Sequence, residues 1–135
     1  LAAENAQRAG LNGAVTWREG NAYAMPFADG EFDAVISNDS LHHWEDPVAI
    51  FNEIARVVKP EGAYFVHDSR RLETWWPRLF AWGIGLTIPA DFRVHYWGSI
   101  RSSYTPEELE ALVARSRLNG WRIEAGFMEI AVVKK

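Results

Sequence analysis

Residues 20–47, GNAYAMPFADGEFDAVISNDSLHHWEDP, contain the strongest indications of the fold. Their centre, Phe32–Ser37, contains the continuous apolar run Ala34-Val35-Ile36, which is typical of a parallel-sheet strand buried on both faces. The dipeptide Asp29-Gly30 before it predicts a turn. The dipeptide Asp46-Pro47 after it predicts a helix start, because Asp is a good N-cap and Pro suits the first helical position.

Helices and strands alternate on either side of this stretch. Upstream, we expect a helix over Leu1–Ala9 and a half-buried strand over Val15–Glu19. Downstream, apolar residues at helical spacing predict a helix that ends at Pro60–Gly62, and a buried strand follows over Ala63–His67. The apolar face of this helix consists of Ile50, Phe51, Ile54, Ala55 and Val58. This alternation predicts an α/β fold with a parallel sheet.

The end of the chain predicts a helix followed by an antiparallel hairpin. Thr105 and Glu108 form a capping-box pattern that starts a helix, and Asn119-Gly120 is expected to end it. The segments Trp121–Ala125 and Phe127–Val133, joined at Gly126, are then expected to pair as two strands.

Residues 72–104 are unusually aromatic for a single segment. They hold eight of the eighteen aromatic residues, namely Trp75, Trp76, Phe80, Trp82, Phe92, Tyr96, Trp97 and Tyr104. Their most apolar part, residues 79–89, is much shorter than the roughly 20 residues of a membrane span. Two interpretations stay open: a helical lid packed on a single domain of residues 1–135, or one wall of an apolar substrate pocket.

Composition narrows the class of protein. The chain has 135 residues, 48% of them hydrophobic, which is enough for one domain with a core. The net charge of −4 argues against a nucleic-acid partner, and the absence of cysteine excludes disulfides and thiolate metal sites. No secretory signal opens the chain, so a cytoplasmic protein is expected.

The densest cluster of reactive side chains is residues 37–46, SNDSLHHWED, at the carboxyl end of a predicted strand. Ligands bind there in open α/β sheets. One of His42 and His43 could act as a general base, or both could be structural, and no third ligand nearby supports a metal site. Asp39 has a competing interpretation as a loop Asx-turn residue.

A second polar run, Asp68-Ser69-Arg70-Arg71, follows the next predicted strand. The two arginines could bind an anion or form a solvated surface pair. No G-x-G-x-x-G follows a strand and no phosphate-binding P-loop occurs, because Gly83-Ile84-Gly85 lies inside the aromatic segment.

Three linked motifs resemble those of class I S-adenosylmethionine-dependent methyltransferases, closest to the branch of the ubiquinone and menaquinone methyltransferases. The first is the passage from Gly20-Asn21-Ala22 through Met25-Pro26-Phe27 to Asp29–Asp33. The second is Leu41-His42-His43-Trp44 with Asp46-Pro47, and the third is Glu53–Gly62, EIARVVKPEG. Together they cover residues 1 to about 71 in the order that the family has.

The resemblance implies a Rossmann-like doubly wound sheet with a carboxyl-terminal antiparallel hairpin. On that template Val15–Glu19, Phe32–Ser37 and Ala63–His67 are the third, fourth and fifth strands. The first two strands and the glycine-rich loop that cradles the cofactor are then missing, and the chain is expected to be truncated, since Leu1 stands within a predicted helix.

The resemblance also implies a cofactor, S-adenosylmethionine, and the residues that bind it. Asn21, where the family usually has Asp, and the backbone of Ala22 would contact adenine. Residues along the loop after the fourth strand would line the methionine side: Asn38, Asp39, Leu41 and His43. His42 or His43 would be the base, and Arg70, Tyr96 and Trp97 are expected to contact a small, fairly apolar acceptor.

Three functional hypotheses follow. The first is methyl transfer, with doubtful activity for this chain alone. The second is a non-catalytic binding or assembly module, in which Val15–Glu19 pairs directly with Phe32–Ser37 or an exposed sheet edge forms a homodimer. The third, a hydrolase or metal enzyme built on His42 and His43, has the weakest support.

Overall fold

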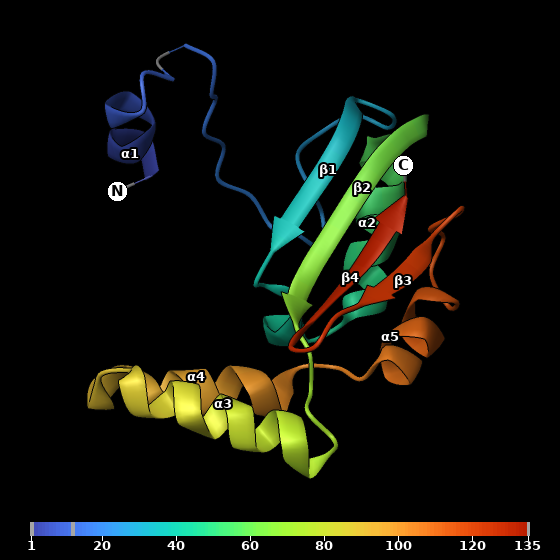
Figure 1. Ribbon diagram of the computed structural model, residues 1–135. Coiled ribbons are helices and arrows are strands. Elements are labelled where there is room, and N and C mark those ends of the chain that lie inside the picture. Colours follow the sequence, from blue (N-terminus) through green and yellow to red (C-terminus); the bar gives the residue numbers. More distant parts are fainter. Residues whose placement is uncertain (1, 12, 135) are drawn as a thin grey trace.

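The computed structural model describes residues 2–11 and 13–134 (Figure 1). The helices are α1 (Ala2–Arg8), the 3₁₀ helix η1 (Leu41–His43), α2 (Pro47–Val57), α3 (Trp75–Thr87), α4 (Ala90–Ser102) and α5 (Pro106–Val113). The strands are β1 (Phe32–Asn38), β2 (Val58–Ser69), β3 (Arg122–Ala125) and β4 (Glu129–Lys134). Among the described residues no helix is long and apolar enough to cross a bilayer.

The strands form one mixed sheet in the order β1-β2-β4-β3 (Figure 1). β1 pairs with β2 in parallel, while β4 is antiparallel to both β2 and β3. The predicted α/β fold and its terminal antiparallel hairpin are therefore confirmed, although both hairpin strands are shorter than expected.

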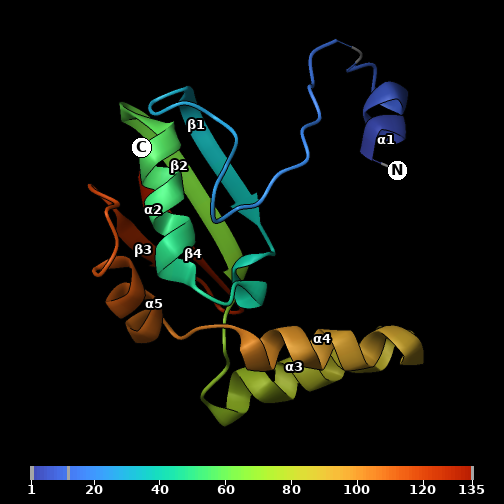
Figure 2. The same cartoon turned by 180° about the vertical axis from the view of Figure 1, so that it is seen from behind.

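The core lies between the sheet and the two helices α2 and α5, which cover one of its faces (Figure 2). Asp46 caps α2 as predicted, since its Oδ1 accepts a hydrogen bond from the backbone N–H of Ala49 at 3.1 Å. The helix buries its apolar stripe through Ile50, Phe51, Ile54 and Val57. These side chains meet the inward residues of the strands, including Tyr64, Val66, Ile130 and Val132.

The opposite face of the sheet is not covered by any helix of the described residues (Figure 1). Ile36 is 76% exposed and Phe65 is 38% exposed. The expectation that β1 is buried on both faces is therefore wrong for the described structure. The apolar run Ala34-Val35-Ile36 shows that the strand could be buried on both faces. Whether it is buried depends on which elements pack against each face.

The junction of α2 and β2 also differs from the sequence expectation. The helix ends at Val57 and the strand begins at once, so Pro60 and Gly62 lie in the strand instead of separating it from the helix. Phe32 pairs with Val58 but Ala34 pairs with Ala63, so the register shifts here and β2 bulges. The bulge absorbs the proline, which cannot donate to a regular ladder.

The segment Val15–Glu19 forms no strand and pairs with nothing in the described residues, so that prediction is wrong here. A strand requires a hydrogen-bonded neighbour, and this segment does not pair with the free edge of β1. The helix predicted at the start is confirmed as α1, with Leu1 outside the described residues. The capping box at Thr105 and Glu108 is also confirmed, but α5 ends at Val113, before Asn119-Gly120.

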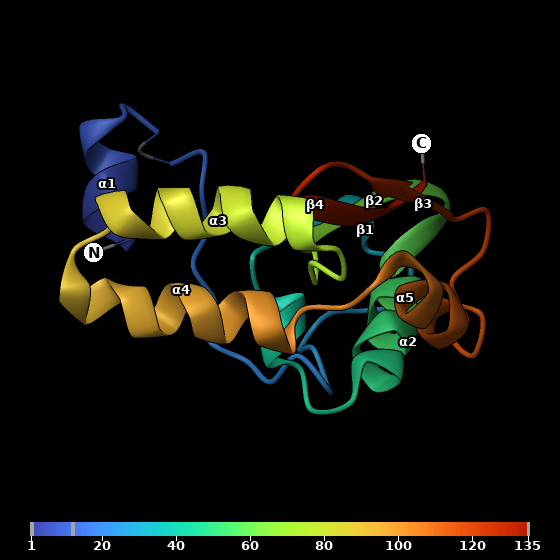
Figure 3. The same cartoon turned by 60° about the horizontal axis from the view of Figure 1, so that its bottom comes forward.

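Most of residues 72–104 form the two helices α3 and α4. α3 and α4 lie side by side as an antiparallel pair beyond the carboxyl ends of β1 and β2 (Figures 1 and 3). The pair is held by small residues, since Ala81 is fully buried and Gly85 sits against the indole of Trp97. We call α3 and α4 with their connection, residues 75–102, the helical hairpin.

Candidate functional site

The carboxyl ends of β1 and β2 bring the first group of predicted site residues together. Asn38 pairs with His67 in the parallel register, and Asn38 Oδ1 lies 2.9 Å from His67 Nδ1. Asp39 then turns the chain in a left-handed conformation, φ 50°, with its N–H donating to the carbonyl of His67 at 3.0 Å. Asn38 and His67 line a hollow of about 480 Å³ on the uncovered sheet face.

His42 forms a buried pair with Asp68. His42 Nδ1 lies 2.7 Å from Asp68 Oδ1, and the two side chains are 5% and 1% exposed. Asp68 also accepts from the backbone N–H groups of His42, at 2.9 Å, and of Ser69, at 2.6 Å. Because an ionised carboxylate only accepts hydrogen bonds, Nδ1 of His42 is the donor in this contact.

The other ring nitrogen of His42, Nε2, is buried and has no hydrogen-bond partner in the described part of the chain. An unpartnered buried polar atom is costly, so this nitrogen marks a place where a ligand or water completes the site. His43 is exposed beside it, with the ring centroids 3.9 Å apart. Within the described residues, no group of three His, Asp or Glu side chains is arranged to hold a metal ion.

The side chain of Leu41 belongs to the core. Its side chain is fully buried in the main core together with Phe51 and Ile130. It therefore anchors η1 to the domain, and only its backbone is left to face a ligand.

Asn21 and Ala22 lie together on the loop that precedes β1. They line a hollow of about 190 Å³ with Arg18, Gly20, Met25, Pro26 and Phe27. Asn21 Oδ1 accepts from the N–H of Tyr23 at 2.9 Å, and Asn21 forms an isolated antiparallel bridge with Ala24. The N–H of Ala22 has no intramolecular acceptor among the described residues, so it is free to donate to a ligand.

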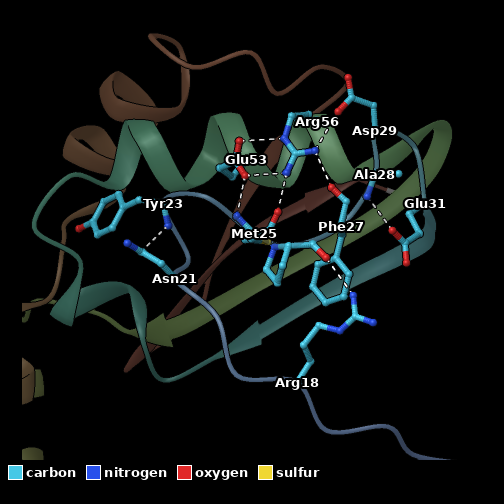
Figure 4. Close-up of polar contacts among 11 residues, drawn as sticks. Arg18, Asn21, Tyr23, Met25, Phe27, Ala28, Asp29, Glu31, Glu53 and Arg56 are labelled. Carbon is cyan, nitrogen blue, oxygen red and sulfur yellow. Dashed lines mark hydrogen bonds and ion pairs between the residues drawn. The ribbon is translucent and has the colours of Figure 1, made fainter.

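Arg56 of α2 holds this loop in place through hydrogen bonds (Figure 4). Its guanidinium donates to the carbonyls of Met25 at 2.9 Å and Phe27 at 2.8 Å, and to Asp29 Oδ1 at 2.8 Å. Glu53, one turn earlier on α2, binds the same guanidinium and accepts from the N–H of Met25 at 2.9 Å. These bonds satisfy the Phe27 carbonyl and give the Met25 carbonyl a second donor besides the N–H of Phe27.

Glu53 and Arg56 each favour the ionised form of the other. The hydrogen bond from Arg56 is the main cause that lowers the pKa of Glu53. The carboxylates of Glu53 and then Asp29 raise the pKa of Arg56 in turn. Both groups therefore stay ionised over the ordinary pH range, which keeps the loop in place.

A second attachment joins the loop to the segment after η1. The hydroxyl of Tyr23 accepts hydrogen bonds from the N–H groups of Glu45, at 3.0 Å, and Asp46, at 3.1 Å. Tyr23 thus connects the Asn21 loop to the loop that leaves β1. The Asn21 loop is therefore attached near both ends of α2, through Arg56 at one end and through the N–H groups of Glu45 and Asp46 at the other.

The three residues predicted to contact an acceptor are not gathered in one pocket. Arg70 lies at the end of β2, donates to the carbonyl of Gly126 at 3.2 Å, and lines a small hollow with Phe127. Trp97 lines a separate hollow of about 290 Å³ beside α3. Tyr96 joins α4 to α3 within the helical hairpin, because its hydroxyl donates to the carbonyl of Ala81 at 3.2 Å.

Sequence reasoning missed Asp68, Tyr23 and the Glu53–Arg56 pair as site residues. Asp68 opens the polar run Asp68-Ser69-Arg70-Arg71, of which only the two arginines were expected to bind a ligand. Its position one residue after His67 at a strand end was the signal that could have found it. Tyr23 and the loop contacts of Arg56 join residues more than twenty positions apart, so no local pattern could have found them. Only the Glu53–Arg56 contact, at a spacing of three, is local.

Comparison with known proteins agrees with this geometry. The family model described as methyltransferase domain matches residues 1–66. An uncharacterised methyltransferase of Schizosaccharomyces pombe is 45% identical over 114 residues, which cover 84% of this chain and 36% of that protein. Cycloartenol-C-24-methyltransferase 1 of Oryza sativa subsp. japonica is 37% identical over 60 residues, 44% of this chain and 17% of that protein.

The solved structures show the same fold. A putative S-adenosyl-L-methionine-dependent methyltransferase of Methanococcus maripaludis superposes with a TM-score of 0.71 at 20% identity, over 98% of this chain and 59% of that one. The chain spans about a third or less of the length of the curated relatives it matches. Each comparison therefore concerns part of a longer protein.

Proposed function

The chain belongs to the class I S-adenosylmethionine-dependent methyltransferases, and we propose that it takes part in methyl transfer from this cofactor to a small, apolar acceptor. The observation that carries the proposal is the loop of Asn21 and Ala22, fastened at both ends of α2 beside the carboxyl end of β1. A loop held in this way keeps its polar groups in one orientation before a ligand arrives, which reduces the entropic cost of binding.

The residues present fit the adenine side of the cofactor. The N–H of Ala22 is a free donor at the hollow, and Asn21 presents its amide there. Asn21 Oδ1 already accepts one hydrogen bond from Tyr23, but an amide oxygen has a second lone pair for an exocyclic amino group. The sequence has no G-x-G-x-x-G motif after a strand, so these residues would hold one part of the cofactor only.

S-adenosylmethionine supplies the methyl group of the reaction. In the proposed mechanism, His42 holds a proton: Asp68 fixes the Nδ1–H tautomer, which leaves the lone pair on Nε2. An acceptor that reaches Nε2 through its hydroxyl or amine would lose its proton to this nitrogen. Asn38, Asp39 and exposed His43 border the same strand ends and would contact the methionine side.

The acceptor side is proposed from the neighbouring hairpin. The helical hairpin lies beyond the carboxyl ends of β1 and β2, where an acceptor would approach the cofactor (Figure 1). Arg70 and Trp97 border hollows at its base, and Tyr96 supports it from within. The rice relative is named for an apolar acceptor, cycloartenol, and this supports an apolar acceptor here.

Calorimetric titration of the 135-residue chain with S-adenosylmethionine tests the proposal. We expect saturable binding that Asn21→Ala weakens by about two- to tenfold, the effect of one hydrogen bond. Asn5→Ala on α1 is the matched control and should leave the affinity unchanged. Absence of binding at millimolar cofactor, or equal effects of the two variants, would overturn the proposed cofactor site.

A second candidate function is a non-catalytic assembly module. The outer edge of β1 has no strand partner in the described residues, and exposed Ile36 lies on the same strand. Open edges of this kind pair with other chains. Concentration-dependent dimerisation, measured by light scattering and abolished by Ala34→Pro on β1, together with absent cofactor binding, would favour this function over methyl transfer.

A further inference from the structure

The outer face of α3 carries a stripe of large apolar side chains. Trp75, Leu79, Trp82 and Leu86 follow each other at intervals of four, three and four residues, so they line one side of the helix. Their exposed fractions are 72%, 50%, 55% and 56%. We call these four residues the aromatic stripe.

The helical hairpin does not need the aromatic stripe for its own packing. α3 packs on α4 through its other side, where Ala81 and Gly85 meet Tyr96 and Trp97. Other exposed apolar residues occur on the two helices: Trp76 at 59%, Phe80 at 53%, Phe92 at 62% and Val94 at 74%. An exposed apolar patch of this extent on a folded domain marks an interaction surface.

Positive charge accompanies the patch. Arg78 lies three residues after Trp75 and four before Trp82, so it flanks the aromatic stripe on α3. Arg78, Arg71 and Arg101 line one hollow of about 290 Å³, in which Glu73 is the only acid. Arg78 and Arg101 have no acidic partner among the described residues.

The charge of this region opposes that of the rest of the chain. Residues 70–104 hold five arginines and two acidic residues, a net charge of +3 with His95 neutral. The whole chain has a net charge of −4, which leaves −7 for the remaining residues. The apolar patch and the positive charge therefore coincide in one part of an otherwise acidic protein.

We propose that the helical hairpin docks on the surface of an anionic lipid bilayer, with the aromatic stripe of α3 inserted at the level of the headgroups. Trp is the residue that prefers this level, because its ring is apolar and its N–H remains near water. Arginines beside it attract anionic headgroups, and the acidic remainder of the protein faces away.

The helix lies on the bilayer and does not cross it. α3 has 13 residues and is therefore about 20 Å long, against roughly 30 Å of hydrocarbon. A second copy of the chain is a less suitable occupant, because two hairpins of net positive charge would repel each other. The inference goes beyond the proposed methyl transfer and does not rest on it, since docking needs neither cofactor nor acceptor.

Co-sedimentation of the purified chain with vesicles tests the inference, without cofactor. Vesicles of phosphatidylcholine alone are compared with vesicles in which one quarter is phosphatidylglycerol. We expect binding to the anionic vesicles, weakening as salt rises because the attraction is screened. The double variant Trp75→Ala/Trp82→Ala should bind at least about tenfold more weakly, because the two exposed indoles that would enter the bilayer are lost.

Matched controls separate docking from general effects. Trp17→Ala should leave vesicle binding unchanged, because Trp17 is as exposed as Trp82, 55%, but lies outside the hairpin. Arg78→Gln should weaken binding about fivefold, the share of one arginine near an anionic surface. Arg115→Gln, an exposed arginine after α5, should not change it.

Two outcomes would overturn the inference. One is absence of binding to anionic vesicles, or binding that the Trp75→Ala/Trp82→Ala variant retains in full. The other is a dimer, seen by analytical ultracentrifugation, that the same variant dissociates while vesicles capture nothing; the stripe would then join two copies. Circular dichroism of the variants confirms that the helices remain, so a loss of binding cannot be assigned to unfolding.

Discussion

Nδ1 of His42 lies 2.7 Å from Oδ1 of Asp68, and this contact joins η1 to the end of β2 across 26 residues of sequence. The pair is buried, and Asp68 accepts two backbone N–H groups as well. The contact therefore has a structural consequence and a chemical one: it anchors the loop after β1, and it decides which imidazole nitrogen carries the proton.

Asp68→Asn should lower the free energy of unfolding by about 1–3 kcal/mol, because an amide replaces a carboxylate that accepts from three donors. Urea denaturation measures this change. Nitrogen NMR of His42 should also report loss of the fixed Nδ1–H tautomer. Asp91→Asn, on exposed α4, is the control and should change stability by less than about 0.5 kcal/mol. Equal stability of the two variants would contradict the role of Asp68.

Arg56→Met should release the loop of residues 20–31, because it removes donors to the carbonyls of Met25 and Phe27 while keeping the apolar stem. Hydrogen exchange of the loop amides should become at least about tenfold faster, while β2 and β4 stay protected. Arg115→Met is the matched control. Unchanged exchange of the loop amides in Arg56→Met would show that other contacts hold the loop.

Gly62→Ala should destabilise the protein by about 1–3 kcal/mol, because the bulge in β2 has no room for a side chain. A Cβ at Gly62 would lie 2.8 Å from both the carbonyl oxygen of Asp33 and Cγ2 of Val58. Gly83→Ala provides the contrast: nothing lies within 4 Å of its Cβ, so this change within α3 should stabilise by about 0.5–1 kcal/mol. Urea midpoints that shift in the same direction for both variants would refute the argument.

Acidic pH should lower the free energy of unfolding, partly through protonation of Glu53. Its hydrogen bond from Arg56 lowers the pKa of Glu53 in the folded state. Stability from the ionised group is therefore complete above the ordinary glutamate pKa of about 4.3 and is lost as pH falls through the lower folded value. Glu53→Gln should flatten the fall of the urea midpoint below about pH 4.3. Glu61→Gln should give a curve parallel to that of the original chain.

Alkaline pH should destabilise the folded protein through Tyr64, because burial raises the pKa of its hydroxyl to about 12. The hydroxyl donates to the carbonyl of Asn119 at 2.8 Å. Because the folded pKa is raised, this contribution is complete below the ordinary tyrosine value near 10 and disappears as pH rises through about 12. Tyr64→Phe should cost about 0.5–1.5 kcal/mol at neutral pH and reduce the alkaline loss. Denaturation at several pH values measures both effects, and an unchanged alkaline slope would argue against this assignment.

The secondary structure around residues 20–47 was predictable because its determinants are local. Asp46 and Pro47 cap α2 through contacts within one turn, and Thr105 with Glu108 does the same for α5. The failures have a different origin. Val15–Glu19 alternates like a strand, but strand formation depends on a pairing partner that its own residues cannot provide.

The candidate site was predictable only in part. The position of Asn38 and His42 after a strand followed from topology, because strand ends of an α/β sheet gather ligand-binding residues. The burial of the Leu41 side chain in the core was not predictable, since the depth of a side chain depends on which helix lies over it. The packing of α3 on α4 decides where Tyr96 and Trp97 point, whereas Arg70 follows β2 and binds the carbonyl of Gly126, so the three residues line different surfaces.

The resemblance to methyltransferases, the α/β class and the starts of the capped helices were readable from the sequence alone, because motif order, hydrophobic period and capping are properties of neighbouring residues. Only the tertiary structure decided that Asp68 holds His42, that Arg56 fastens the loop of Asn21, and that the aromatic stripe faces outward. These relationships join residues far apart in the chain, and their energies arise only when packing brings the groups within contact distance and removes water between them.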